Sequence, residues 1–324
     1  MKQLAALATA CLVALVGCSS GSSHASQSAA TTTAPAASST PSAAPTTASC
    51  DRPHLPGQWT QVLRFEGRDR TYELYVPPKY TGRQAVPVVF NFHGFGSNAK
   101  QQMIYGNFRP EADRDGFLIV APDGQDPAAR HFNLTGEKGL QNDVQMVGAL
   151  LDHIEGSFCV DSRRVYSTGM SDGGAMTSAL ACAMPKRFAA YAAVAVVFYS
   201  RGCANGSLVA IAAFSGTADP VVPFTGGRVN CCGGPSLPAP TAAMAGWAAH
   251  NGCATKRERK IGTDVALTRW TACRGTSAVD FYVIQGGGHT WPGSIPIPSL
   301  GRTTQTINAT SVIWQFFQAH PQAA

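Results

Sequence analysis

Most of the chain alternates between short apolar runs and segments whose apolar residues recur with helical spacing. Continuous apolar runs of this length are typical of strands that are buried on both faces of a sheet. We expect such strands at residues 86–92, 117–121, 164–168, 192–198, 208–214 and 279–284, after an early hairpin of 60–65 and 71–76. Helices are expected at 144–154, 173–184 and 311–319. Strands separated by helices predict an α/β fold with a mostly parallel central sheet and helices on both faces.

The N-terminus follows a different pattern. Residues 4–16 form an apolar run of 13 residues behind a single lysine, which fits the core of a signal peptide and is shorter than the roughly 20 residues that span a bilayer. The run ends in the sequence LVGC at 15–18, which resembles the box at which bacterial lipoproteins are cut before a lipid-modified cysteine. We predict a lipoprotein signal peptide at 1–17 and a diacylglycerol on Cys18. Ordinary secretion with cleavage elsewhere is the alternative.

Residues 18–49 predict a tether. Positions 19–49 hold ten Ser, nine Ala, six Thr and three Pro, which is too little large apolar surface to offset the entropy of folding. A segment of small residues behind a lipidated cysteine suits a surface-anchored protein, and Ser/Thr/Pro stalks are often O-glycosylated. The remaining residues, 50–324, have the length of one large α/β domain.

Composition narrows the class of protein further. A hydrophobic content of 44% and a charged content of 14% exclude a disordered or coiled-coil protein. The net charge of +6 is scattered and forms no basic run, which argues against a nucleic-acid partner. We expect contact with a membrane through the lipid anchor only.

The cysteines agree with export. When Cys11 and Cys18 are set aside, eight remain, and an even number in an oxidising compartment favours disulfides. We predict pairs between segments that the expected fold brings close, and the last pair follows by elimination as a vicinal disulfide. The four pairs are Cys50–Cys159, Cys182–Cys203, Cys253–Cys273 and Cys231–Cys232. A zinc site is the alternative, but no CxxC or HxxxH spacing supports it.

The candidate nucleophile is Ser171. It stands in the sequence GMSDG at 169–173, directly after an expected buried strand and directly before an expected helix. A nucleophile elbow requires this context, because flanking glycines allow a strained turn that exposes the serine hydroxyl. A glycine-rich turn with a capping serine is the structural alternative.

A serine hydroxyl needs a base, and the base needs a carboxylate that orients it. His289 is the candidate base, because the last expected strand leads into it through three glycines. Asp219 follows the strand at 208–214 and is the candidate acid, whereas its competitor Asp280 falls within a strand. The order Ser171, Asp219, His289 is that of α/β-hydrolases.

Acyl transfer also needs hydrogen-bond donors for the developing oxyanion. We expect them to be the backbone N–H groups of Asp172, next to the nucleophile, and of Phe95, in the loop after the strand at 86–92. His93 in the same loop is expected to be a structural hydrogen-bonding residue. Trp291 is expected to line a pocket for an aromatic acyl group, or else to pack beside its neighbouring proline.

Five motifs occur in one order along the chain. They are HGFG at 93–96, APDG at 121–124, RVYSTGMSDGG at 164–174, GTADPVVP at 216–223 and GGHTWPG at 287–293. Together they resemble the feruloyl esterase and polyhydroxybutyrate depolymerase group, especially its bacterial lipoprotein members, over about residues 50–320. Two positions depart from the group: Asp172 stands where Asn is frequent, and Phe95 where a small residue or Cys is frequent.

The resemblance implies a carboxylic ester hydrolase with an α/β-hydrolase fold that uses neither metal nor cofactor. The implied substrates are feruloyl or acetyl esters of polysaccharides, or hydroxyalkanoate polyesters. Two alternatives remain open at this point: acyl transfer to a sugar acceptor, and a non-catalytic carbohydrate-binding protein on the same scaffold.

Overall fold

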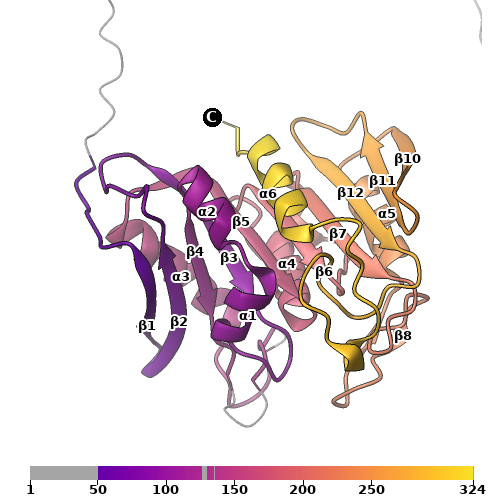
Figure 1. The fold of residues 1–324 in the computed structure, drawn as a ribbon, viewed down its shortest axis with the longest axis horizontal. Coiled ribbons are helices and arrows are strands. Elements are labelled where there is room, and N and C mark those ends of the chain that lie inside the picture. Colours follow the sequence, from indigo (N-terminus) through magenta and orange to yellow (C-terminus); the bar gives the residue numbers. More distant parts are fainter. Residues whose placement is uncertain (1–49, 126–129, 135, 324) are drawn as a thin grey trace, which may run out of the picture. The chain divides into compact units, whose positions relative to one another are not determined.

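The computed structural model describes residues 50–125, 130–134 and 136–323 (Figure 1). The predicted signal peptide, the Cys18 anchor and the tether lie outside these residues. The described chain is built around one sheet of ten strands. In spatial order they are β1 (Gly57–Phe65), β2 (Arg68–Val76), β4 (Leu118–Pro122), β3 (Val86–Phe92), β5 (Val160–Met170), β6 (Ala190–Val194), β7 (Ala210–Gly216), β12 (Ala278–Ile284), β11 (Val265–Thr271) and β10 (Thr255–Ile261).

The helices and short elements connect these strands. They are α1 (Ala99–Gly106), α2 (Arg109–Asp115), α3 (Asp143–Ser157), α4 (Asp172–Ala183), α5 (Pro240–His250), α6 (Ala309–Ala319), the 3-10 turns η1 (Cys203–Gly206) and η2 (Pro298–Leu300), and a two-stranded ladder of β8 (Gly227–Arg228) and β9 (Ser236–Leu237).

The middle of the sheet is parallel and its two margins are antiparallel. Strands β4, β3, β5, β6, β7 and β12 run in one direction. Antiparallel pairs β1–β2 and β11–β10 complete the sheet at its two ends, indigo and orange in Figure 1. The predicted mostly parallel sheet is therefore confirmed.

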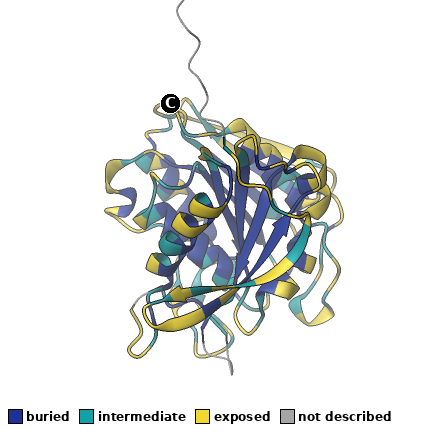
Figure 2. Ribbon diagram, turned by 90° about the vertical axis from the view of Figure 1, so that its left-hand side faces the viewer, coloured by how far each residue is buried: buried dark blue, intermediate teal, exposed yellow. Residues whose placement is uncertain are grey.

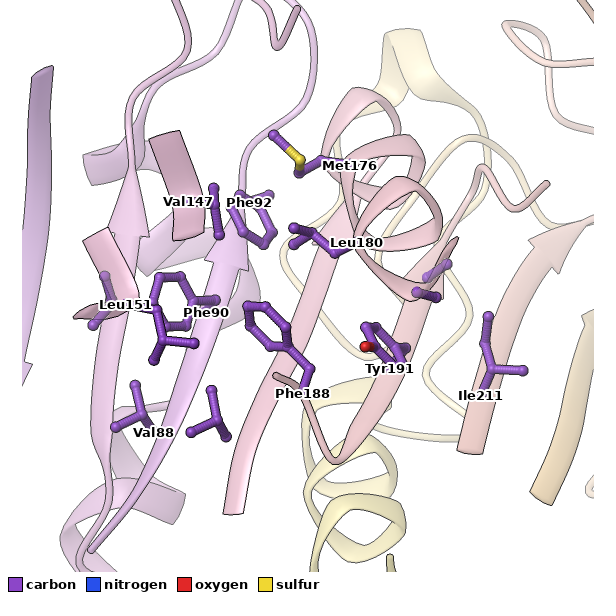
Figure 3. Packing of buried hydrophobic residues seen from close by; sticks show 14 of the residues in the cluster. Val88, Phe90, Phe92, Val147, Leu151, Met176, Leu180, Phe188, Tyr191 and Ile211 are labelled. Atoms are coloured by element: carbon purple, nitrogen blue, oxygen red, sulfur yellow. The ribbon is translucent and has the colours of Figure 1, made fainter. Parts of the chain in front are cut away.

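Each face of the sheet carries its own apolar layer, because alternate side chains of a strand point to opposite faces. On β3, Phe90 and Phe92 belong to the layer that α3, α4 and α5 cover, and Val89 belongs to the layer under α1, α2 and α6. Figure 3 shows Phe90 and Phe92 packed among side chains of α3 and α4. The Phe90 ring meets Phe188 edge-on at 5.6 Å between centroids. In Figure 2 the inner strands are buried between helices whose outer faces are exposed.

The predicted strands and helices all occur, with shifted ends. The strand predicted at 192–198 ends at Val194, because Ala195 adopts a left-handed φ of 66°. Elements without a clear apolar period were not predicted. The strand β10 is the plainest case: its sequence TKRERKI is exposed at all but the last residue, so no apolar face marks it.

Three predicted disulfides are confirmed: Cys50–Cys159, Cys182–Cys203 and Cys253–Cys273. The predicted Cys231–Cys232 pair is wrong, since both side chains are free thiols. A bond between neighbours would close a small ring across one planar trans peptide. Instead Cys232 has a φ of 60° and is exposed, while Cys231 is partly buried. Elimination failed here because an even number of cysteines does not oblige the last two to pair.

Among the described residues, no helix combines the length and apolar character needed to cross a membrane.

Candidate active site

Parallel strands bring the predicted site residues to one edge of the sheet. Ser171 follows β5, Asp219 follows β7 and His289 follows β12, while Phe95 lies in the loop after β3. The strands β3, β5, β6, β7 and β12 are neighbours in this order. Because parallel strands end at the same edge, the loops that follow them converge there.

Ser171 occupies a strained turn between β5 and α4. Its φ of 57° and ψ of −115° are unusual for a residue with a side chain, and such strain persists only where the surroundings impose it. The surroundings are tight: a Cβ at Gly173 would lie 2.1 Å from the carbonyl oxygen of Phe92, and one at Gly169 would lie 2.5 Å from that of Gly173. The two glycines of the motif are therefore required by close backbone packing.

His289 and Asp219 form a buried pair. The imidazole Nδ1 lies 2.7 Å from Asp219 Oδ2, and both side chains are almost fully buried. The other carboxylate oxygen, Oδ1, accepts the backbone N–H groups of Val221 and Val222, each at 2.8 Å. These bonds fix the carboxylate, which in turn fixes the ring and leaves Nε2 for a second partner.

Asp280, the competing acid, is occupied elsewhere. It lies on β12, is 2% exposed, and forms a two-point ion pair with Arg269 of β11, at 2.8 Å from Nε and 2.5 Å from Nη2. The structure thus brings Asp219, and not Asp280, to His289.

The loop after β3 lies directly against the nucleophile. A Cβ at Gly94 would be 3.3 Å from the Cβ of Ser171. His93 is fully buried; its Nδ1 donates to the Gly94 carbonyl at 2.7 Å, and its Nε2 accepts the Gly124 N–H at 2.8 Å. Burial lowers the pKa of His93, and a neutral ring is what this pair of bonds requires. The bonds fit the structural role expected from the sequence.

Ser171 and His289 open into a pocket of about 390 Å³. Its walls are mostly apolar. The other lining residues are Gly94, Phe95, Gly96, Ser97, Gln101, Tyr105, Met170, Val221, Cys231, Cys232, Ile297 and Leu300. Burial raises the pKa of the Cys231 thiol to about 11, and the neighbouring Cys232 thiol and Asp219 carboxylate act in the same direction.

The pocket role predicted for Trp291 is wrong. Its side chain is 1% exposed and packs edge-on against Phe108 in the layer under α1, α2 and α6. Its indole N–H donates to the Thr310 hydroxyl at 3.0 Å. The alternative, a packing tryptophan, is the correct one.

Sequence reasoning missed most of the pocket wall. Tyr105 and Gln101 come from α1, and Ile297 and Leu300 from the segment around η2. The sequence predicts none of these elements, because single residues that line a pocket from separate segments carry no periodic signal. The adjacent cysteines Cys231 and Cys232 stand out in the sequence, but their pattern favours a disulfide and does not indicate a place in the pocket wall.

The carboxyl group of Asp172 is also part of this region. Asp172 is the first residue of α4 and is partly buried. Its Oδ2 accepts the backbone N–H of Phe132 at 2.7 Å. Burial raises the pKa of Asp172 to about 6, against the lowering effect of the Phe132 N–H and of His131. Within the described residues, no three His, Cys, Asp or Glu side chains are grouped so as to hold a metal ion.

A mostly parallel sheet with a strained serine after β5, an Asp–His pair after β7 and β12, and helices on both faces defines the α/β-hydrolase fold. A solved acetyl xylan esterase from Aspergillus awamori has the same fold, with a TM-score of 0.59, 16% identity, and coverage of 81% of this chain and 99% of that one.

The chain belongs to the family described as Esterase PHB depolymerase, whose model matches residues 70–244. Similar curated proteins include "Probable feruloyl esterase C" of Aspergillus oryzae, 29% identical over 78% of this chain and 84% of its own length. Feruloyl esterase B of Piromyces equi is 28% identical over 66% of this chain and 41% of its own length. The chain is a carboxylic ester hydrolase.

Replacement of Asp172 by Asn is expected to stabilise the protein at neutral pH and to change its stability little near pH 4. The pKa of about 6 in the folded protein lies above the value of roughly 3.9 in an unfolded chain. The stability that this carboxyl contributes is therefore complete below about pH 4 and is lost as the pH rises through about 6.

Because Asn does not ionise, the difference in the free energy of unfolding between D172N and wild type should grow by roughly 2 kcal/mol between about pH 4 and pH 8. Urea unfolding at a series of pH values measures this difference. A difference that is constant with pH would contradict the raised pKa.

Proposed function

We propose that the chain is a serine esterase in which Ser171, His289 and Asp219 act as a catalytic triad. The observation that carries the proposal is the 2.7 Å contact between His289 Nδ1 and Asp219 Oδ2, on a histidine that shares a pocket with the strained Ser171. With Nδ1–H donated to the carboxylate, His289 Nε2 takes the hydroxyl proton as Ser171 attacks the ester carbonyl. The same imidazolium then protonates the leaving alcohol.

The oxyanion of the tetrahedral intermediate is assigned to the backbone N–H groups of Phe95 and Asp172. Both residues lie next to the nucleophile. The loop of residues 93–96, here called the Phe95 loop, packs on Ser171 through Gly94, and Asp172 follows Ser171 as the first residue of α4. A helix N-terminus presents unpaired N–H groups and a partial positive charge, which favour a developing anion. Water activated by His289 then cleaves the acyl-enzyme.

The pocket supports a substrate with a compact apolar acyl group. Its volume of about 390 Å³ is within the range of roughly 300–1,000 Å³ for small-molecule sites. We propose feruloyl or acetyl esters of polysaccharides as substrates, in keeping with the curated relatives that carry feruloyl esterase names. Hydroxyalkanoate polyesters are the second candidate, supported by the family match.

We further propose that the enzyme is exported and anchored by a lipid on Cys18. Three disulfides in the catalytic domain fit an oxidising compartment, and the anchor rests on the LVGC sequence behind an apolar run. Two acyl chains on one cysteine are enough for stable membrane attachment.

Replacement of Ser171 by Ala is expected to lower kcat for p-nitrophenyl acetate and methyl ferulate by a factor on the order of 10⁴–10⁶. The wild-type protein should also react with a fluorophosphonate probe at Ser171, as judged by peptide mass spectrometry. A pure carbohydrate-binding protein would not react. An S171A protein that keeps a tenth of the activity would contradict the assigned nucleophile.

Replacement of Asp219 by Asn is expected to lower kcat by about 10⁴, because the amide holds the wrong tautomer of His289. The matched control is D280N, since Asp280 is also a buried Asp bonded to a basic side chain, but that side chain is Arg269. D280N should lose stability and keep its kcat per folded molecule. The reverse result in steady-state assays would mean that the acid is misassigned.

Replacement of Cys18 by Ala is expected to move the protein from the membrane fraction to the soluble secreted fraction. The 31 residues at 19–49 separate Cys18 from the catalytic domain, so turnover of a soluble ester should not change. Fractionation followed by a p-nitrophenyl acetate assay measures both. A C18A protein that stays with the membrane would refute the anchor.

A further inference from the structure

The carboxylate of Asp172 links the nucleophile to a segment, residues 130–133, that is remote in sequence. Asp172 follows Ser171 directly, and its Oδ2 accepts the Phe132 backbone N–H at 2.7 Å. A side chain on the first residue of a helix often faces solvent. Here it is partly buried and bonded to the chain 40 residues earlier.

The segment 130–133 touches the loop of residues 93–96 at three points. The Arg130 carbonyl accepts the Gly96 N–H at 2.8 Å. The His131 ring stacks on Phe95, with 5.9 Å between centroids and 27° between planes. The Phe132 ring lies 4.8 Å from that of His93. Residues on both sides of the Phe95 N–H group are thus supported by this segment.

A second carboxylate holds the next amide of the same segment. The Asn133 N–H donates to Asp143 Oδ2 at 2.7 Å. Asp143 is fully buried at the start of α3 and also binds Gln125 at 2.9 Å and Arg70 at 2.5 Å. Two consecutive amides are therefore held by carboxylates of two different helices, of which one is fixed in the core and the other adjoins the nucleophile.

We propose that Asp172 is a positioning residue for the oxyanion hole: its carboxylate holds residues 130–133 against the Phe95 loop. One residue then supplies one oxyanion donor through its backbone and fixes the other through its side chain. The proposal rests on the serine esterase function proposed above. It gives a role to a carboxyl group at a place where burial opposes its charge.

The ionised form is the effective one, because charge-assisted hydrogen bonds are shorter and stronger than neutral ones. In the described structure, the charged or titratable groups that act on this carboxyl are His131, from the segment itself, and Asp143, from α3. His289 lines the same pocket on the other side of Ser171. Asn can still accept the Phe132 N–H through its carbonyl oxygen, whereas Ala cannot.

The test compares D172A, D172N and the control D152A, which removes an exposed Asp of α3 that pairs with Arg187 at the surface. Steady-state hydrolysis of p-nitrophenyl acetate gives kcat and KM between about pH 5 and pH 9. The rate of labelling by a fluorophosphonate probe is measured on the same preparations. Thermal unfolding shows whether each variant is folded at the assay temperature.

At about pH 8, D172A should lose roughly 10–100-fold in kcat, with KM changed less than about threefold, because a displaced oxyanion donor acts on the transition state. D172N should recover kcat to within about threefold of wild type. Below about pH 6 the ratio of the wild-type kcat to that of D172N should fall toward one, since the protonated carboxyl, like the Asn amide, accepts the Phe132 N–H only through a neutral oxygen. D152A should match wild type throughout.

The proposal is overturned if D172A keeps the wild-type kcat, if D172N is as impaired as D172A, or if the ratio of the wild-type kcat to that of D172N rises as the pH falls below about 6. Failure of the underlying function looks different. In that case the wild-type protein itself does not react with the fluorophosphonate probe, and both the serine esterase function and the positioning role of Asp172 are refuted.

Discussion

The parallel pairing of the neighbouring strands β3, β5, β6, β7 and β12 is the constraint on which the site depends. Side chains that are more than 190 residues apart in the sequence converge only because these strands end at one edge of the sheet. The pairing is itself held by the two apolar layers. A slip of one residue in any inner strand would exchange the side chains of the two faces, so the register of the core also sets the register of the site.

The strain at Ser171 is a local consequence of this arrangement. The turn has little room, since the backbone of β3 lies within contact distance of Gly173. The same closeness places the Phe95 loop on the nucleophile. The sheet on one side and helix α4 on the other hold the serine in a conformation that an isolated peptide would avoid.

The sequence was most informative where one physical requirement acts on neighbouring residues. The elbow could be predicted because its two glycines, its serine and its flanking strand and helix are contiguous. His289 and Asp219 could be ordered because each follows a buried strand. The pocket wall could not be predicted, because Tyr105, Ile297 and Leu300 come from segments whose apolar pattern is weak. The predicted pocket role of Trp291 is wrong for a related reason. Its proximity to His289 along the chain does not determine on which side of the backbone its ring lies.

The sheet ends at β10, whose seven residues include Lys256, Arg257, Arg259 and Lys260. An edge strand offers unpaired backbone groups to any other strand that approaches it. Here a second copy of the protein would have to align the same four cations with their equivalents, at the spacing of about 5 Å that separates paired strands. The barrier to such growth is electrostatic and weakens with ionic strength. The four cations of β10 therefore oppose the edge-to-edge pairing by which copies of the protein could join their sheets into fibres.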